Sequence, residues 1–420
     1  MPPDAAHSAP RNILGRALRS LQDTNVNNSR RFCSFTFSLL LALALAACST
    51  PPSTQKPICS STQATPWSLL GEIRWPHDTL FTGTPVGGLS SLDYDPASGL
   101  YYLVSDDRST RAPARFYTAR IRYDETGLHE VNLQGMTPLL SPAQRPYASS
   151  RTPEAGIATP DAEAMRVLPG GKTLLWSSEG DFARGFGPQL TEASTDGRRL
   201  RNWPLPPGLE ISQPVSAKQG PRNNFTLEGM SLSEDGKTLW LSMEAPLKQD
   251  GPLPAPGKAG GPVRITAYDT ATQQPVRQLA YVPDALPDKL WVRRGAINGI
   301  SEILADGPDH LLVLERSFSA PLNFGARLYR VSTRADTGTD TLNLPQLTPD
   351  NHQPLSKQLV LDLADVGLRS VDNIEGMSWG PPLPDGRRVL LLVSDNNFNP
   401  AEVTQFIALR QERGHCGAGL

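Results

Sequence analysis

The same four residues occur twice in this chain, as Glu228-Gly229-Met230-Ser231 and again as Glu375-Gly376-Met377-Ser378. Three further segments share the pattern: Gly87-Gly88-Leu89-Ser90, Glu163-Ala164-Met165-Arg166 and Asn298-Gly299-Ile300-Ser301. Counted at the second residue, the five segments are spaced by 76, 65, 70 and 77 residues. Regular spacing of this kind indicates one supersecondary unit that is used five times.

A turn, a hydrophobic strand and an acidic residue follow each of the five segments. The expected strands are Leu100–Val104, Thr173–Ser177, Thr238–Ser242, Leu311–Leu314 and Arg388–Val393. The acids after them are Asp106, Glu179, Glu244, Glu315 and Asp395. A third strand is expected in four repeats, at Arg115–Arg122, Val263–Tyr268, Ala326–Val331 and Thr404–Leu409. The second repeat shows no clear third strand.

Short strands joined by turns at regular intervals are typical of stacked blades of antiparallel sheet. We therefore predict an all-β fold, a β-propeller of four-stranded antiparallel blades with five recognisable repeats. The segment Trp67–Trp75 is expected to close the ring by supplying the strand that the last repeat lacks. A sixth blade remains an alternative, because Leu128–Ala158 is long enough to hold extra strands.

The composition agrees with many short elements. Forty prolines and 35 glycines among 420 residues argue against helical bundles and coiled coils. The 40 Lys and Arg nearly balance the 42 Asp and Glu, so charge does not indicate a nucleic-acid partner. Six histidines and four cysteines are too few for a zinc-rich or disulfide-dense scaffold. We expect a monomer.

The start of the chain has the pattern of an export signal. Arg30-Arg31 precede an apolar run, Phe35–Ala47, which is too short to cross a bilayer and ends in Leu45-Ala46-Ala47-Cys48. This ending resembles a bacterial lipobox, in which Cys48 is lipidated. We predict a signal peptide at 1–47, a lipid-anchored tether at 48–60 and the propeller at 61–416. The protein is then anchored by lipid to a membrane of the bacterial envelope and faces the periplasm. An ordinary secretory signal is the alternative.

Cys33 and Cys48 belong to the leader and the anchor, so the two remaining cysteines lie near opposite ends of the mature chain. Cys59 and Cys416 can pair in an oxidising compartment, and a last blade built from both chain ends would bring them close together. Two unpaired thiols near frayed ends are the alternative.

Several motifs resemble the phytase-like domain family, also called "esterase-like activity of phytase". They are Gly87–Asp95, Ser105–Ser109, Ala114–Tyr117, Asn224–Met230, Leu314–Arg316, Asp372–Met377, Ser394–Phe398 and Thr404–Phe406. The similarity extends over roughly residues 80 to 411, in the expected order. The resemblance implies a propeller fold and activity on phosphoesters, and it implies nothing finer about the substrate.

Equivalent residues of successive blades form rings around the axis of a propeller. Glu163, Glu228 and Glu375 are expected to form one partial ring with Asn298. Converging carboxylates repel one another unless they are protonated or share a cation, and oxygen ligands alone suit Ca²⁺ or Mg²⁺. We predict a metal site, with Ca²⁺ as the candidate cofactor, formed by Asp106, Glu179, Glu244, Glu315 and Asp395. The candidate catalytic acids are Asp106, Glu228 and Glu375.

Arginines next to these acids are candidates for binding a small phosphoester. Arg108, Arg115 and Arg316 are the predicted substrate-binding residues, because the guanidinium fork matches a pair of phosphate oxygens. The alternative for each acid and each arginine is structural, in turn hydrogen bonds and in salt bridges between blades.

Other catalytic motifs fail. Gly376–Gly380 matches the G-x-S-x-G string of serine esterases, but Pro381-Pro382 follows and prevents the helix that such a site needs. Serines also stand at the position of Ser378 in three other repeats, so this serine is expected to belong to the scaffold. The histidines show no pairing that suggests a triad or a zinc site.

Two hypotheses remain. The first is a periplasm-facing, cation-dependent phosphoesterase, a phytase-like hydrolase held at the membrane by lipid. The second is a non-catalytic propeller that binds an envelope partner or polymer. A carboxylesterase ranks third, because it needs a triad that the sequence lacks.

Overall fold

The computed structural model describes residues 67–211, 218–286, 296–319 and 323–413. Contacts within the chain divide it into two units, Met1–Ile58 and Cys59–Leu420, and all described residues belong to the second. Cys48, Cys59 and Cys416 lie outside the described residues. No helix among the described residues is long and apolar enough to span a membrane.

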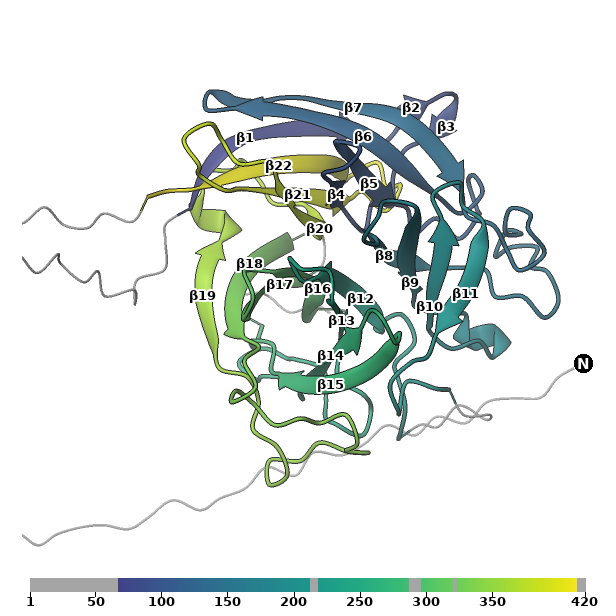
Figure 1. Cartoon of the computed structure of the whole chain (residues 1–420), viewed down its shortest axis with the longest axis vertical. Coiled ribbons are helices and arrows are strands. Elements are labelled where there is room, and N and C mark those ends of the chain that lie inside the picture. The colour runs from purple at the N-terminus through teal and green to yellow at the C-terminus, as the bar shows by residue number, and fades with distance from the viewer. Residues whose placement is uncertain (1–66, 212–217, 287–295, 320–322, 414–420) are drawn as a thin grey trace, which may run out of the picture. The chain divides into compact units, whose positions relative to one another are not determined.

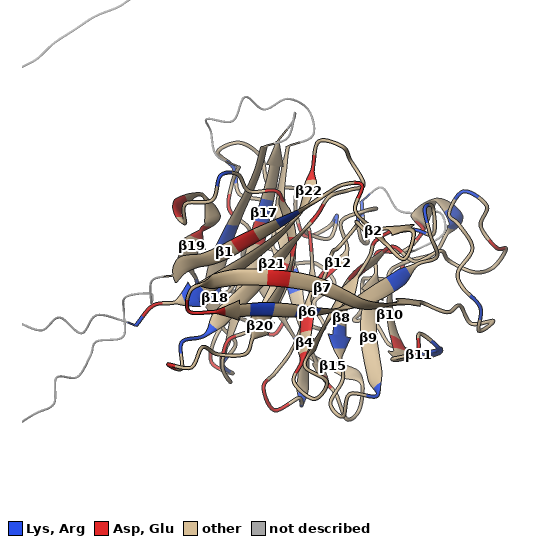
Figure 2. Cartoon of the chain, turned by 90° about the horizontal axis from the view of Figure 1, so that it is seen from above, with Lys and Arg blue, Asp and Glu red and all other residues tan. Residues whose placement is uncertain are grey.

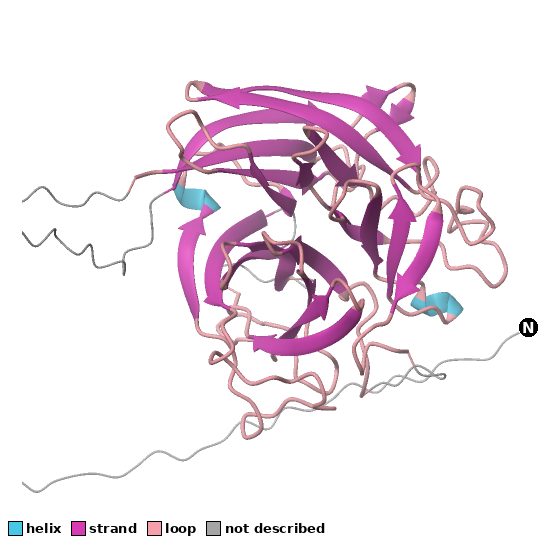
Figure 3. Ribbon diagram, in the orientation of Figure 1, coloured by secondary structure: helices cyan, strands magenta, loops and turns pink. Residues whose placement is uncertain are grey.

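Five four-stranded antiparallel sheets form a ring, as the repeat predicts (Figure 1; Figure 3). The first blade contains β4 (Asp93–Asp95), β5 (Leu100–Val104), β6 (Arg115–Asp124) and β7 (Gly127–Pro138). The second contains β8 (Ala162–Val167), β9 (Thr173–Ser178), β10 (Gln189–Ser194) and β11 (Arg199–Trp203). The third contains β12 (Leu227–Leu232), β13 (Thr238–Met243), β14 (Val263–Asp269) and β15 (Gln274–Tyr281).

The fourth blade contains β16 (Ile297–Ala305), β17 (His310–Ser319), β18 (Asn323–Ser332) and β19 (Lys357–Asp362). The fifth contains β20 (Asn373–Gly380), β21 (Val389–Asp395), β22 (Val403–Gln411) and β1 (Trp67–Pro76). A small hairpin, β2 (Leu80–Phe81) with β3 (Thr84–Pro85), and two short 3-10 helices, Phe182–Arg184 and Leu363–Asp365, complete the described structure.

The predicted closure of the ring is confirmed. β1 pairs antiparallel with β22, from Trp67 opposite Gln411 to Pro76 opposite Val403. The inner strands β4, β8, β12, β16 and β20 each contact the next one around the axis, and β20 contacts β4 again. The described ring therefore has five blades. The segment that left room for a sixth contributes β7, the outer strand of the first blade.

The second strand is buried along nearly all of its length in four of the five blades, because it is covered on both faces. These strands are β5, β9, β13 and β21. Large side chains fill the spaces between blades, and the rings of Trp203 in the second blade and Tyr268 in the third lie 6.1 Å apart. Each buried Leu, Val or Phe contributes roughly 1.5–3 kcal/mol, so this layer holds the blades together.

The repeat glycines lie where adjacent blades approach closely. A Cβ atom on Gly229 would lie 2.6 Å from the backbone nitrogen of Ile303, and one on Gly376 would lie 2.9 Å from that of Leu92. Ser378 supports the same contact, since its Oγ accepts a hydrogen bond from the Tyr94 N–H at 3.1 Å. The repeated segment is therefore explained in part by the packing of neighbouring inner strands.

Charged residues are spread over the whole ring. Figure 2 shows acidic and basic segments interspersed along the strands and loops, as the near balance of Lys and Arg against Asp and Glu leads one to expect. The exception is the centre of the ring, where the acids predominate.

Candidate functional site

A cavity of about 580 Å³ opens at the end of the ring where the second strands finish. Its carboxyl groups outnumber its other charged groups, since Arg316 is the only basic residue among the described residues that line it. The acids are Asp106, Asp161, Glu163, Glu179, Glu228, Glu244, Glu375, Asp395 and Glu402. The remaining lining residues are amides and apolar side chains: Asn224, Phe225, Ile297, Phe318, Phe324, Asn373, Asn397 and Asn399.

The strands explain why these groups converge. Asp161 and Glu163 are two residues apart at the start of the second blade's inner strand, and so are Asn373 and Glu375 in the fifth blade. Residues two apart on a strand project to the same face. Glu179 and Glu244 follow the ends of β9 and β13, so they meet the inner-strand acids around the axis.

Two groups of three carboxylates are close enough to share a cation. The first group is Asp161, Glu163 and Glu179, and the second is Glu179, Glu228 and Glu244. In each group, three carboxylate oxygens, one from each residue, all lie within 4.8 Å of one another. Ligands on opposite sides of Ca²⁺ are about 5 Å apart, since each Ca–O distance is roughly 2.3–2.6 Å. The spacing and the oxygen-only donor set therefore fit a hard divalent cation. Glu179 belongs to both groups.

The carboxylate of Glu163 has no hydrogen-bond or ion-pair partner among the described residues, although the residue is buried, with only 8 % of its surface exposed. Burial and the nearby carboxylates of Glu228 and Asp161 raise its pKa well above the usual range. Burial and the nearby carboxylate of Glu244 likewise raise the pKa values of Glu179 and Glu228. A cation would remove much of this repulsion, because opposite charge favours the ionised form.

The Asp106 carboxylate also lines the cavity and has no hydrogen-bond or ion-pair partner among the described residues. Its pKa is raised well above the usual range by burial and by the charge of Glu375. Asp106 therefore retains a proton at a pH where a solvated aspartate has lost it.

Arg316 links the acids of the third and fifth blades. Its Nη2 donates to Glu244 Oε1 at 2.9 Å, and its Nη1 donates to Asn373 Oδ1 at 3.0 Å. Asn373 in turn donates to Glu375 Oε1 at 2.8 Å. These contacts fix one guanidinium inside an acidic cavity.

The structure corrects the predicted rings in the fourth blade. Strand pairing places Met165, Met230, Met377 and Ile303 at equivalent positions, opposite Trp176, Leu241, Leu392 and Val313. The residue three positions after each of these partners is Glu179, Glu244, Asp395 and Arg316, respectively. Arg316, and not Glu315, thus completes the ring of second-strand residues.

Glu315 and Asn298 lie outside the cavity lining. Glu315 accepts hydrogen bonds from the Tyr281 hydroxyl at 2.6 Å and from Lys357 Nζ at 2.5 Å. Asn298 donates to Glu315 Oε2 at 2.7 Å. The predicted metal-ligand role of Glu315 and the predicted ring position of Asn298 are therefore replaced by a buried polar network between the third and fourth blades.

The three predicted arginines occupy different environments. Arg115 is 1 % exposed and forms a 2.8 Å ion pair with Asp107, so its role is structural. Arg108 lies 3.5 Å from Asp161 and 3.3 Å from Asp181, next to one of the cavity acids. Only Arg316 of the three lines the cavity.

Several cavity residues were not predicted. Asp161 could have been found from its two-residue spacing before Glu163, and Asn373 from the same spacing before Glu375. Glu402 comes from a loop, and its two oxygens accept hydrogen bonds from Asn397 and Asn399. No repeat pattern marks these loop residues.

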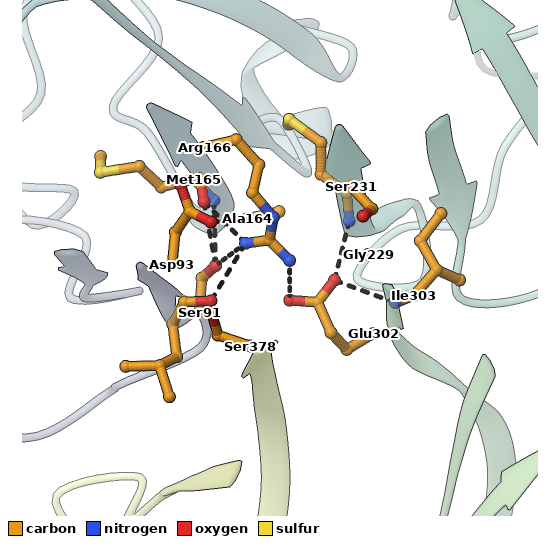
Figure 4. A network of polar contacts seen from close by, with 12 residues as sticks. Ser91, Asp93, Ala164, Met165, Arg166, Gly229, Ser231, Glu302, Ile303 and Ser378 are labelled. Atoms are coloured by element: carbon orange, nitrogen blue, oxygen red, sulfur yellow. Dashed lines mark hydrogen bonds and ion pairs between the residues drawn. The ribbon is translucent and has the colours of Figure 1, made fainter. Parts of the chain in front are cut away.

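A buried ion pair joins the inner strands of two blades that are not neighbours in the ring (Figure 4). Arg166 Nη2 donates to Glu302 Oε2 at 2.7 Å, which joins the second blade to the fourth. Glu302 Oε1 also accepts the Met230 N–H at 2.8 Å and the Ile303 N–H at 2.9 Å. Arg166 is 2 % exposed and Glu302 is 0 % exposed, so solvent does not reach this ion pair. Neither residue lines the cavity.

Comparison with known proteins agrees with the motifs. The sequence matches the phytase-like family, described as "Esterase-like activity of phytase", over residues 84–398. The chain belongs to this family. No curated protein matches this phytase-like chain.

The solved structures that this chain matches are remote in sequence, and their TM-scores are low. The catalytic domain of the Coprinopsis cinerea GH62 α-L-arabinofuranosidase is 10 % identical, with a TM-score of 0.40 and coverage of 83 % of this chain and 97 % of that one. The GH43 endo-arabinanase from Bacillus licheniformis is 13 % identical, with a TM-score of 0.36 and coverage of 78 % and 95 %. The Kuenenia stuttgartiensis hydrazine synthase is 13 % identical, with a TM-score of 0.33 and coverage of 76 % and 81 %. Likenesses this remote say nothing about the activity of the phytase-like protein.

Proposed function

We propose that this phytase-like protein is a cation-dependent phosphoesterase. The observation that carries the proposal is the pair of carboxylate groups that share Glu179. Asp161, Glu163, Glu228 and Glu244 would complete the coordination of Ca²⁺ there. A bound divalent cation would polarise the phosphoryl group and make an attacking water more acidic.

The remaining cavity residues would position the ester and move protons. Arg316 offers a guanidinium for phosphoryl oxygens, in a cavity otherwise rich in negative charge. Hydrolysis forms a bond from water oxygen to phosphorus and breaks the phosphorus–oxygen bond of the ester. Asp106 would give its proton to the leaving alcohol, and Glu375 would accept a proton from the attacking water. These assignments retain Asp106, Glu228 and Glu375 as the principal acids of the site.

The experiment measures phosphate release from phytate and from an aryl phosphate by the purified full-length protein, in calcium chloride and in EDTA. We expect calcium-dependent release from at least one of the two esters, with a loss of about 100-fold or more in Asp106→Asn and a weaker calcium response in Glu228→Gln. Asp235→Asn is the matched control, because Asp235 lies in an exposed turn outside the cavity. Full turnover in EDTA and in both cavity variants would refute the proposal.

A non-catalytic propeller is the second candidate. One observation favours it, since the described cavity lining contains no histidine, serine, cysteine or lysine. Folded protein that releases no phosphate under either condition would support this candidate, with an envelope partner or polymer as the ligand.

The proposed location follows from the sequence, with Cys48 as the lipidated residue of an envelope protein that faces the periplasm. Incorporation of labelled fatty acid that is lost in Cys48→Ser would support it. Unlabelled wild-type protein would contradict it.

A further inference from the structure

One side of the cavity is apolar, although acids line most of it. Phe225, Ile297, Phe318 and Phe324 all contribute to the lining, and each is only half-buried. The rings of Phe318 and Phe324 lie 5.1 Å apart with an interplanar angle of 41°. The two residues are opposite each other on β17 and β18. The cavity therefore presents an aromatic pair next to its charged groups.

Strand register places this aromatic pair beside Arg316. Arg316 and Phe318 are two residues apart on β17, and their partners Ala326 and Phe324 are two residues apart on β18. Side chains with this spacing share a face and are about 7 Å apart along the strand. β17 continues past Arg316 to Ser319, so the phenyl rings lie toward the end of the strand. A group attached to a phosphoryl at Arg316 would extend along the two rings.

The negative charge of the cavity limits how many phosphate groups a substrate can carry. Nine carboxyl groups face one guanidinium among the described lining residues. Two divalent cations would offset four negative charges, which leaves the cavity acidic when all the carboxyls are ionised. A ligand with several phosphates would meet strong repulsion there. A ligand with one phosphoryl group and an uncharged remainder would meet much less repulsion.

We propose that Phe318 and Phe324, with Ile297 and Phe225, form a subsite for the apolar leaving group of a singly phosphorylated ester. The substrate class is an aryl or similarly apolar phosphomonoester. This inference rests on the proposed function, since the phosphoryl group is placed by Arg316 and the cation site. It differs from the family's name in disfavouring polyphosphorylated substrates.

The test compares two phosphonates that cannot be hydrolysed, benzylphosphonate and methylphosphonate, by calorimetric titration of the full-length protein in calcium. We expect benzylphosphonate to bind about tenfold more tightly, since burial of part of a phenyl ring contributes roughly 1.4 kcal/mol. Phe324→Ala should abolish this preference and leave the affinity for methylphosphonate unchanged. Leu359→Ala is the control, because this side chain is 48 % exposed on the outer strand β19 of the same blade.

The outcomes separate the two proposals. Equal affinities for the two phosphonates in the wild-type protein would overturn the subsite and leave the phosphoesterase proposal standing. A preference that persists in Phe324→Ala would overturn the assignment to the aromatic pair. Binding of neither phosphonate, with or without calcium, would overturn both proposals.

Discussion

Replacing Arg166 with methionine tests the role of its ion pair with Glu302. The substitution keeps most of the side-chain volume and removes the guanidinium that donates to Glu302, to Ser91 Oγ at 2.8 Å and to the Met165 carbonyl at 2.7 Å. Glu302 would remain buried without its counter-ion. Removing one partner of a buried ion pair costs about 3–5 kcal/mol. Domains are stable by roughly 5–15 kcal/mol, so we expect a folded but weakened variant.

The pH dependence provides a sharper prediction. Burial raises the pKa of Glu302 to about 7 even beside Arg166, and it should rise further in the variant. Above pH 7, Glu302 would keep its proton in the folded variant, whereas it has lost this proton in the folded wild type and in the unfolded chain. The stability deficit should therefore widen as the pH rises from 6 to 9, by roughly 2–3 kcal/mol at about 1.4 kcal/mol per pH unit.

Urea unfolding followed by tryptophan fluorescence, at pH 6 and pH 9, measures this deficit. The double variant Arg166→Met/Glu302→Gln is the control, since glutamine keeps an oxygen for the Met230 and Ile303 N–H groups and carries no charge. Its deficit should widen less with pH than that of the single variant, and the part that remains comes from the carboxylate of Asp93, which lies 3.8 Å from Arg166. A single variant within about 1 kcal/mol of wild type at pH 9 would refute the reasoning, as would a deficit that is the same at both pH values.

Three further predictions concern the cation, the repeat glycine and the chain ends. Calcium should raise the melting temperature more at pH 8 than at pH 5, because the cavity acids with raised pKa values must ionise to bind it. At a free calcium concentration of 100 times Kd, binding adds about 2.7 kcal/mol to the free energy of unfolding. A rise in melting temperature that is the same at both pH values would contradict this prediction. Gly229→Ala should lower the free energy of unfolding, measured by chemical denaturation, by about 1–3 kcal/mol, because the added Cβ would lie 2.6 Å from the Ile303 nitrogen. Ala164→Gly, at the equivalent position of the second blade, should lower it by about 1 kcal/mol or less. Peptide mapping without reductant should recover Cys59 joined to Cys416, and alkylation of both thiols in unreduced protein would count against that bond.

The repeat predicted the architecture well because blade packing imposes the same demands five times. The strands after the turns, the closing strand at Trp67–Trp75 and the five-blade ring all follow from apolar patterning, and the structure confirms them. The strands β10 and β11 were missed, because β11 is largely polar and lies at the outer edge of its blade.

The site was predicted less completely for a specific reason. Asn298–Ser301 matches the repeated letters, but the structural equivalent of the repeat glycine in the fourth blade is Glu302. A glutamate is accepted there because it meets Arg166, which lies 136 residues away in the chain. A local pattern does not contain that partner, and the expectation of an acid directly after the strand favoured Glu315 over the adjacent Arg316.

The pairing of β1 with β22 has a consequence for biogenesis. Ser68 and its hydrogen-bond partner Glu412 are 344 positions apart, so β1 has no neighbour in its sheet until almost the whole chain has been made. Synthesis of that length takes roughly 17–70 s at about 5–20 residues per second. During this interval an apolar strand edge stays open to aggregation or to chaperones. The ring therefore closes only when both chain ends have been made, and a truncation that removed β1 or β22 would leave it open.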